Sequence, residues 1–414
     1  MQVHWPEPAH APGPAGRAAG ELGSKGARRA LLGFFISGVL VSFLGAILPS
    51  WQHHLTSDYG IVSLYFLGLI VGLVSSVWIS PRLLGSRGLS WTLAFSCGLA
   101  GAAFLYLAFL SPPWSYWWRV GGMIVVGCAA GILHTAIFHA VSPMYRHDPL
   151  ATVNLAGILF GLGCFLEALA ISFGYSMYTA PTIQVWIAAV PALFGWMYRR
   201  TQFDALPVPP RPPTGTVRSA VRNPGAVLLS LLLFFQLGNE WALAGWLALF
   251  LSQRLGISPA TALRMLALYW LALLVGRVAA QWLLPRVRHG RLLLASVVAS
   301  MFGCVILAST NNQFGAVTGV LLVGLAFAPI YPLVVERIGR RFPYYHPGFY
   351  NGIFSFALAA GLLTPCLMGL AAMAWGLRTV MAFPLAGSAI VFFLLILIWL
   401  EARLSAHARP VEGT

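Results

Sequence analysis

The sequence predicts an all-α membrane protein whose twelve transmembrane helices form two six-helix halves. Three observations support this prediction: charged residues are scarce, apolar runs of about 20 residues recur along the chain, and the second half repeats features of the first. Of the 414 residues, 59% are hydrophobic and only 8% are charged. A soluble domain needs about 25% charged residues to cover its surface, so most of this surface is expected to face lipid.

The apolar runs define the expected helices. A helix of about 20 residues crosses the hydrocarbon core of a bilayer, which is about 30 Å thick. The first run has no small-residue exit of the Ala-x-Ala kind, so we expect an uncleaved span rather than a signal peptide. The predicted spans are residues 30–51, 59–80, 90–110, 118–141, 152–173, 182–199, 224–251, 262–284, 290–309, 313–336, 348–373 and 376–400.

Polar segments separate the expected domains. The N-terminal segment is rich in Ala, Gly and Pro and lacks periodicity, which predicts a disordered cytoplasmic tail. The segment between the sixth and seventh runs contains several prolines, which oppose helix formation and favour a cytoplasmic linker. The expected organisation is a tail at 1–28, a six-helix bundle at 29–200, the linker at 201–223, a second six-helix bundle at 224–403 and a tail at 404–414.

The net charge of +15 would suggest nucleic-acid binding in a soluble protein, but its distribution indicates membrane topology. If the N-terminus is cytoplasmic, most of the 25 Lys and Arg residues lie on the cytoplasmic side, which is the positive-inside pattern. The sequence therefore predicts a multi-pass protein of a bacterial inner (plasma) membrane, with both termini cytoplasmic and no nucleic-acid partner. The exceptions are Arg119, Arg254, Arg264 and Arg378 on the other side and Arg277 inside a span.

A repeat relates the two halves. Several identical residues recur at a constant offset of 204 and, further along, of 197. Because each half contains six spans, the chain returns to the same side of the membrane, so the repeat is parallel. The matches are Tyr65 with Tyr269, Trp78 with Trp282, Pro81-Arg82 with Pro285-Arg286, Gly122 with Gly319, Gly127 with Gly324 and Asn154 with Asn351.

Two parallel six-span halves joined by a cytoplasmic linker resemble the major facilitator superfamily, in which the substrate site lies between the halves near mid-membrane. Within it, the seventh and eighth spans are similar to those of the fucose–galactose–glucose proton symporter branch, through Gly238, Glu240, Trp246 and Gly276-Arg277. The stretch that begins at Asn154 resembles the fifth span of this branch, and the stretch that ends at Pro365 resembles its eleventh span. Gly38, Gly45 and Pro49 fit its first span. The resemblance implies alternating access and proton-coupled uptake of a monosaccharide.

Polar residues inside the spans are the candidates for transport. Glu167 and Glu240 are the carboxylates well inside predicted spans, and such residues are functional candidates because a charge in lipid is costly. Gln236, Asn239 and Glu240 stand at positions i, i+3 and i+4, which predicts that they lie on one face of a helix. We expect Gln236, Asn239 and Glu240 to bind substrate, and Glu240 or Glu167 to carry the proton. The alternative is that they form hydrogen bonds between helices.

Aromatic and histidine side chains complete the predicted site. A sugar has an apolar face and a rim of hydroxyls, so Trp246 and Tyr269 beside these polar groups are candidate substrate contacts. The fourth span carries His134 and His139 where some members of the branch carry an acid. His134 is a candidate for substrate binding and proton coupling; the alternative is a neutral histidine bonded to a neighbouring helix.

Residues near the cytoplasmic ends of the spans are expected to act in gating. They are Asn154, Asn351, Arg277, Arg82 and Arg286. Arg277 lies about 10 Å and Glu240 about 20 Å from the cytoplasmic end, so no direct ion pair between them is expected. Instead, Arg277 is predicted to snorkel or to bind carbonyls and a loop acid. The loop after the second span, PRLLGSRG, has no acid, so carbonyls at the ends of neighbouring helices are the predicted partners of Arg82 and Arg286.

Motifs of catalysis or nucleotide binding are absent from the sequence, so no enzyme, cofactor or metal site is expected. The five Cys residues occur singly within predicted spans, which is typical of packing residues. The expected partners are a sugar-like solute, H⁺ and the lipid bilayer, and the protein is expected to be a monomer. Two other functions stay open: efflux of amphipathic drugs or metabolites, and sensing without transport.

Overall fold

The computed structural model of the protein describes residues 26–110, 114–147, 149–177, 180–203, 223–284, 286–341 and 347–407. The predicted tails and the linker lie mostly outside these ranges. The α-helices are α2 (Gly33–Ile47), α3 (Tyr59–Arg87), α4 (Leu89–Ala108), α5 (Tyr116–His147), α6 (Pro149–Ser176), α7 (Ala180–Arg199), α9 (Pro224–Leu255), α10 (Pro259–Leu283), α11 (His289–Ser309), α12 (Gln313–Phe327), α13 (Ile330–Arg341), α14 (Pro347–Trp375) and α15 (Ala382–His407), with a 3-10 turn η1 (Leu377–Met381) before α15.

Each predicted span corresponds to one helix, except the tenth, which corresponds to two. Ten helices of the described chain are long and apolar enough to cross a membrane. The remaining two spans are α7, with 20 residues, and α14, with 29 residues. The tenth span is made of α12 and α13, which are separated at Pro329, a residue that cannot donate a backbone hydrogen bond. The predicted fold class is confirmed.

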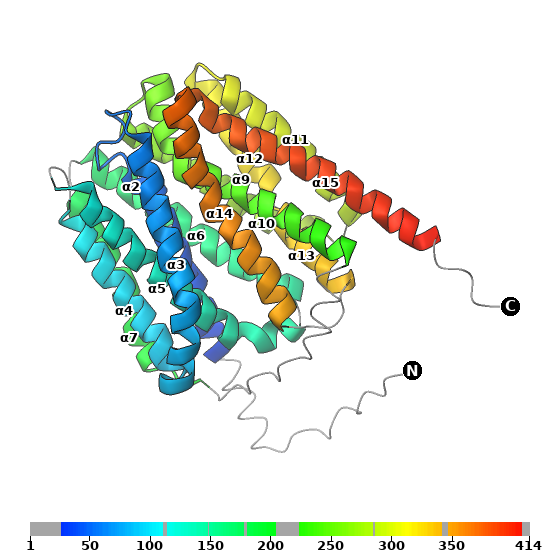
Figure 1. Ribbon diagram of the computed structural model, residues 1–414, viewed down its shortest axis with the longest axis horizontal. Coiled ribbons are helices and arrows are strands. Elements are labelled where there is room, and N and C mark those ends of the chain that lie inside the picture. Colours follow the sequence, from blue (N-terminus) through cyan, green and yellow to red (C-terminus); the bar gives the residue numbers. More distant parts are fainter. Residues whose placement is uncertain are drawn as a thin grey trace.

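Helices of each half pack mainly with one another. α3 packs on α5, α4 on α7 and α2 on α6, whereas α9 packs on α14 and α15, and α12 packs on α10 and α11. Figure 1 shows α2 to α7 on one side of the molecule and α11, α12 and α15 on the other. Contact between the halves is made mainly by α6 with α10, α3 with α14, and α2 with α9, and α6 also contacts α13.

Glycines at close helix crossings make the repeat visible in the packing. A Cβ atom at Gly127 of α5 would meet the backbone of Leu69 in α3. At Gly324 of α12, its repeat partner, a Cβ atom would lie 2.8 Å from the carbonyl oxygen of Tyr269 and 3.2 Å from the nitrogen of Leu273, both in α10. Because Leu273 lies 204 residues after Leu69, the two crossings are equivalent, and the halves are pseudo-symmetric.

The turn between α9 and α10 has strong local signals. α9 ends at Gly256, whose left-handed φ of 62° suits glycine. Ser258 then caps α10 by accepting a hydrogen bond from the Thr261 N–H, with Pro259 at the first helical position. This short turn places α9 and α10 antiparallel and adjacent. We call the end of the molecule with this turn the outer end, following the predicted topology, and the opposite end the inner end.

α9 is enclosed by other helices over much of its length. Its residues from Gly238 to Ser252 are all buried, because α2, α10, α14 and α15 surround it. The polar residues Gln236, Asn239 and Glu240 are therefore buried among helices rather than exposed to lipid.

Candidate functional site

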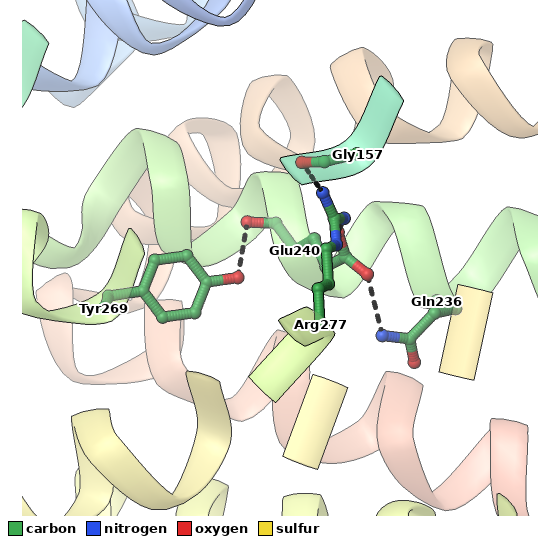
Figure 2. A network of polar contacts seen from close by, with 5 residues as sticks. All are labelled: Gly157, Gln236, Glu240, Tyr269 and Arg277. Atoms are coloured by element: carbon green, nitrogen blue, oxygen red, sulfur yellow. Dashed lines mark hydrogen bonds and ion pairs between the residues drawn. The ribbon is translucent and has the colours of Figure 1, made fainter. Parts of the chain in front are cut away.

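Side chains of α9 and α10 surround Glu240, and α6 contacts the same network through Arg277. Gln236, one turn earlier on α9, donates a hydrogen bond from Nε2 to Glu240 Oε1 at 3.1 Å. On α10, Tyr269 donates from its hydroxyl to the Glu240 backbone oxygen at 3.5 Å, and Arg277 Nη2 lies 3.6 Å from Glu240 Oε2. Figure 2 shows the Arg277 side chain passing Glu240 and reaching Gly157 of α6, in the other half.

The ion pair between Arg277 and Glu240 corrects the expectation that they would not meet. Counted from the shared outer turn, Glu240 is 15 residues and Arg277 is 18 residues along its helix, or about 22 and 27 Å. The two residues therefore differ in depth by about 5 Å. This is half of the difference of about 10 Å that follows from counting residues from the predicted cytoplasmic ends of the spans. Side chains also lean toward the N-terminus of their own helix, so in antiparallel helices these two lean toward each other.

Arg277 also connects the two halves. Its Nη1 donates a hydrogen bond to the carbonyl oxygen of Gly157 at 2.5 Å. A carbonyl was one of its expected partners, but the acid beside it is Glu240 of α9 and not the expected loop acid. A Cβ atom at position 157 would lie 2.9 Å from Nη1 and 3.2 Å from Cζ of Arg277. A methyl group at this position would therefore force the guanidinium to move away from its present position against α6.

The charges in this network are almost fully shielded from solvent. The side chains of Arg277 and Glu240 are 8% and 7% exposed. Burying either charge alone is costly, whereas a hydrogen-bonded pair offsets much of that cost. The loss of one of the two charges, with the other left buried, is therefore expected to destabilise this arrangement of the network.

The polar stripe on α9 divides between two neighbours. Gln236 and Glu240 face α10, but Asn239 donates from Nδ2 to Ser388 Oγ of α15 at 3.4 Å. The reason is geometric: at 100° per residue, Asn239 is about 100° around the helix from Glu240. The structure thus brings Gln236 and Glu240 together, whereas Asn239 points toward α15.

Aromatic rings surround the same region. Phe160 of α6, one turn beyond Gly157, lies edge-on to Trp241 and to Trp270, with ring centroids 6.2 Å apart in each case. Phe160 could not be singled out from the sequence, because it is one of many phenylalanines in apolar runs. Trp246 lies elsewhere: it is fully buried and donates from Nε1 to the Pro365 carbonyl of α14 at 2.8 Å.

Two buried polar side chains near this region have free hydrogen-bonding groups. Neither amide atom of Asn154 has a partner among the described residues, although the side chain is 3% exposed. The same holds for Nε1 of Trp270 within the described part of the chain. Asn154 precedes Gly157 by three residues, so the two share a face of α6. The side chain of Asn351, its repeat partner, lies outside the described residues.

The other predicted residues lie apart from this network. His134 of α5 is hydrogen-bonded to Ser37 of α2, so the bond between helices that the sequence left as an alternative is present. Glu167 is buried in α6, and its Oε1 has no partner in the described ranges. Arg286 donates to the carbonyl of Trp282 at 2.6 Å, which is a helix-end carbonyl but of its own helix rather than a neighbouring one. Arg82 is exposed.

Comparisons with known proteins agree with this architecture. Residues 229–414 match the family model described as Major Facilitator Superfamily. An uncharacterised MFS-type transporter of Yersinia pestis is 24% identical over 115 residues. That alignment covers 28% of this chain and only 30% of the relative's length.

Solved structures cover nearly the whole chain. The MFS transporter FucP in its outward conformation is 17% identical, with a TM-score of 0.60, and the match covers 90% of this chain and 98% of FucP. A second structure of FucP is described as the E. coli fucose:proton symporter. The nucleoside transporter NupG is 13% identical, with a TM-score of 0.67, and the match covers 91% of this chain and 99% of NupG.

At these identities the structural matches establish the fold alone. The match of the second half to the family model is independent of them. The chain therefore has the major facilitator fold and resembles the transporters of the Major Facilitator Superfamily.

Proposed function

We propose that the chain is a secondary active transporter that moves a small hydrophilic solute, a monosaccharide, by proton-coupled symport. The observation that carries this proposal is the network of Glu240, Arg277 and Gly157, which joins a buried, protonatable carboxylate to the contact between the halves. The description of FucP as a fucose:proton symporter supports the same substrate class and coupling ion.

The network offers a physical route for coupling. An ionised Glu240 balances the charge of Arg277, and Arg277 holds α10 to the backbone of α6. A protonated Glu240 would leave the guanidinium without its counter-charge, which favours a different arrangement of α6 and α10. Proton binding and the position of the halves are then linked, because each alters the free energy of the other. Glu167 and His134 are proposed as further proton sites.

The surroundings of the network suit a sugar. Phe160, Trp241 and Trp270 offer apolar ring surfaces, and Asn154, Gln236 and Glu240 offer donors and acceptors for hydroxyls. Tyr269 remains a proposed contact beside Glu240. Asn239, Trp246 and His134 are also proposed contacts, although each would first leave its present hydrogen-bond partner.

A nucleoside is the second candidate substrate. An amide with a free donor and a free acceptor, as in Asn154, pairs well with the edge of a nucleobase, and the rings at Phe160 and Trp270 suit its plane. The similarity to NupG, described as a nucleoside transporter, favours the same class.

The remaining proposals concern topology and gating. We retain two domains at 29–200 and 224–403, cytoplasmic termini in a bacterial inner membrane, and a monomer. Asn154 and Asn351, with Arg277, Arg82 and Arg286, are proposed to act when the inner end opens and closes.

Uptake into proteoliposomes tests the proposed function. A panel of radiolabelled monosaccharides and nucleosides, with organic cations as the efflux class, is measured with and without an inward proton gradient. We expect one sugar to accumulate only with the gradient. Flux of that sugar that is equal with and without proton or sodium gradients would contradict the coupling, and transport of organic cations without sugars would favour efflux. Ligand binding without flux would favour a sensor.

A further inference from the structure

Gln253, near the outer end of α9, contacts the connection between α2 and α3 in the opposite half. Its Nε2 donates to the backbone oxygens of His53 at 3.1 Å and Thr56 at 3.0 Å. Its Oε1 accepts a hydrogen bond from the Tyr59 hydroxyl at 2.8 Å. One amide side chain thus uses both of its N–H groups and its oxygen to join the halves.

The connection, residues 48–58, is itself anchored on the N-terminal half. Trp51 is 2% exposed and packs against Tyr65 of α3, with ring centroids 5.1 Å apart. The guanidinium of Arg119 lies 5.4 Å from the centroid of the Trp51 ring and 5.8 Å from that of Tyr65. Gln52 between the anchored residues has a left-handed φ of 67°, a conformation that non-glycine residues rarely adopt. Gln253 therefore binds a fixed part of the other half, in a conformation that its contacts hold.

Further contacts close the halves at the same end. Ser63 of α3 donates to the carbonyl of Cys366 in α14 at 2.8 Å, and Ser172 of α6 donates to the carbonyl of Ala260 in α10 at 2.9 Å. These bonds join one helix directly to another, whereas Gln253 reaches from α9 to the α2–α3 connection.

The side chain of His53 lies in the buried base of this connection. Its Nε2 is 3.3 Å from the Tyr65 hydroxyl, and the residue is 6% exposed. The titratable and charged groups around it are Arg119 and Tyr116 of α5, Tyr65 of α3, and His54 and Asp58 of the connection, while α9 contributes the neutral Gln253. Asp58 is the acid of this set and is exposed, so a second positive charge beside Arg119 would be poorly balanced.

Burial and the neighbouring Arg119 and His54 lower the pKa of His53 from 6.5 to about 4, although Asp58 acts in the opposite direction. Burial also lowers the pKa of His54. Because the pKa of His53 is lowered in the closed arrangement, protonation favours an open arrangement in which the ring is exposed and its pKa is higher. The closed arrangement is thus fully favoured above pH 6.5 and is weakened as the pH falls toward 4.

We propose that Gln253 and the α2–α3 connection form an outer latch between the halves, and that protonation of His53 releases it. The link is direct, because the His53 carbonyl accepts the Gln253 hydrogen bond and the His53 ring is the group that must leave the buried base. The latch rests on the proposed alternating access, but not on the identity of the substrate or on proton symport.

Distances across the outer end test this proposal without any substrate. Spin labels are placed at Leu55→Cys and Phe314→Cys, whose native side chains are 72% and 82% exposed on opposite halves. Cys128, which is half-buried, is replaced by Ala, and the other cysteines are buried. Electron–electron distances in the purified full chain are measured at pH 7.5 and pH 5.

The wild-type background is expected to be closed at pH 7.5, and its ratio of open to closed molecules should rise roughly 10- to 30-fold at pH 5. Gln253→Leu should open at pH 7.5, and Tyr59→Phe should open less because it removes one bond. Arg254→Gln is the matched control, since Arg254 bonds Asn311 within its own half, and it should behave as wild type. His53→Gln should stay closed at both pH values.

Two results would overturn the latch. Gln253→Leu and Tyr59→Phe with wild-type distances at pH 7.5 would show that Gln253 does not hold the halves together. A His53→Gln variant that still opens at pH 5 would show that another group senses the proton. A failure of sugar transport would leave these distance measurements unaffected, so the two proposals are tested separately.

Discussion

At the scale of single residues, Glu240 and Arg277 form a pair whose members respond differently to the loss of the other. A carboxylate without its partner can take up a proton and become neutral, whereas a guanidinium cannot lose one. Glu240 could be predicted from the sequence because a carboxylate in an apolar run is rare. Its pairing with Arg277 could not, because counting residues gives the depth of a Cα atom and not the direction or reach of a side chain.

This asymmetry predicts that Glu240→Gln destabilises the protein more than Arg277→Gln. Removing one partner of a buried pair typically costs about 3–5 kcal/mol, and only the Arg277 variant can offset that cost by protonation of Glu240. The double variant should recover stability relative to Glu240→Gln alone. Thermal unfolding of the four purified proteins in one detergent measures this, and equal losses in the two single variants would argue against a buried ion pair.

At the scale of helices, the contact of α6 with α10 positions the network. Gly157 lets the Arg277 guanidinium reach the α6 backbone, and Phe160 on the same helix packs edge-on to Trp270 of α10. The sequence predicted both helices and, through the topology, their antiparallel orientation. It did not indicate that the Gly157 carbonyl would accept a hydrogen bond from Arg277. A glycine in an apolar span is common, and its role depends on which helix crosses it.

Gly157→Ala is therefore expected to disturb the network, and Gly161→Ala is its matched control. A Cβ atom at position 161 would lie 3.8 Å from Leu274, an ordinary contact, whereas one at position 157 would lie 2.9 Å from Arg277 Nη1. We expect Gly157→Ala to reduce proton-driven accumulation several-fold and Gly161→Ala to leave it near wild type. If the two variants accumulate solute equally, the bond from Arg277 to α6 is not part of the coupling.

At the scale of the whole molecule, the two halves meet along α6 and α10 and are joined at the outer end by Gln253. The parallel repeat in the sequence predicted two equivalent halves, and the matching crossings at Gly127 and Gly324 agree with it. The contacts between the halves were not predictable, because the repeat relates residues within each half and says nothing about how the halves face each other. Asn239, which was expected to bind substrate, bonds Ser388 within its own half, because it lies about 100° around α9 from Glu240.

The central claim is that Glu240 couples proton movement to solute movement, and solute-induced proton flux tests it most directly. The transported sugar is added to lightly buffered, unenergised proteoliposomes while the external pH is recorded, and counterflow of the same sugar is measured in parallel. Wild type is expected to make the medium transiently alkaline as protons enter with the sugar. Glu240→Gln should retain counterflow but show no alkaline shift, whereas an alkaline shift equal to wild type in that variant would contradict the account.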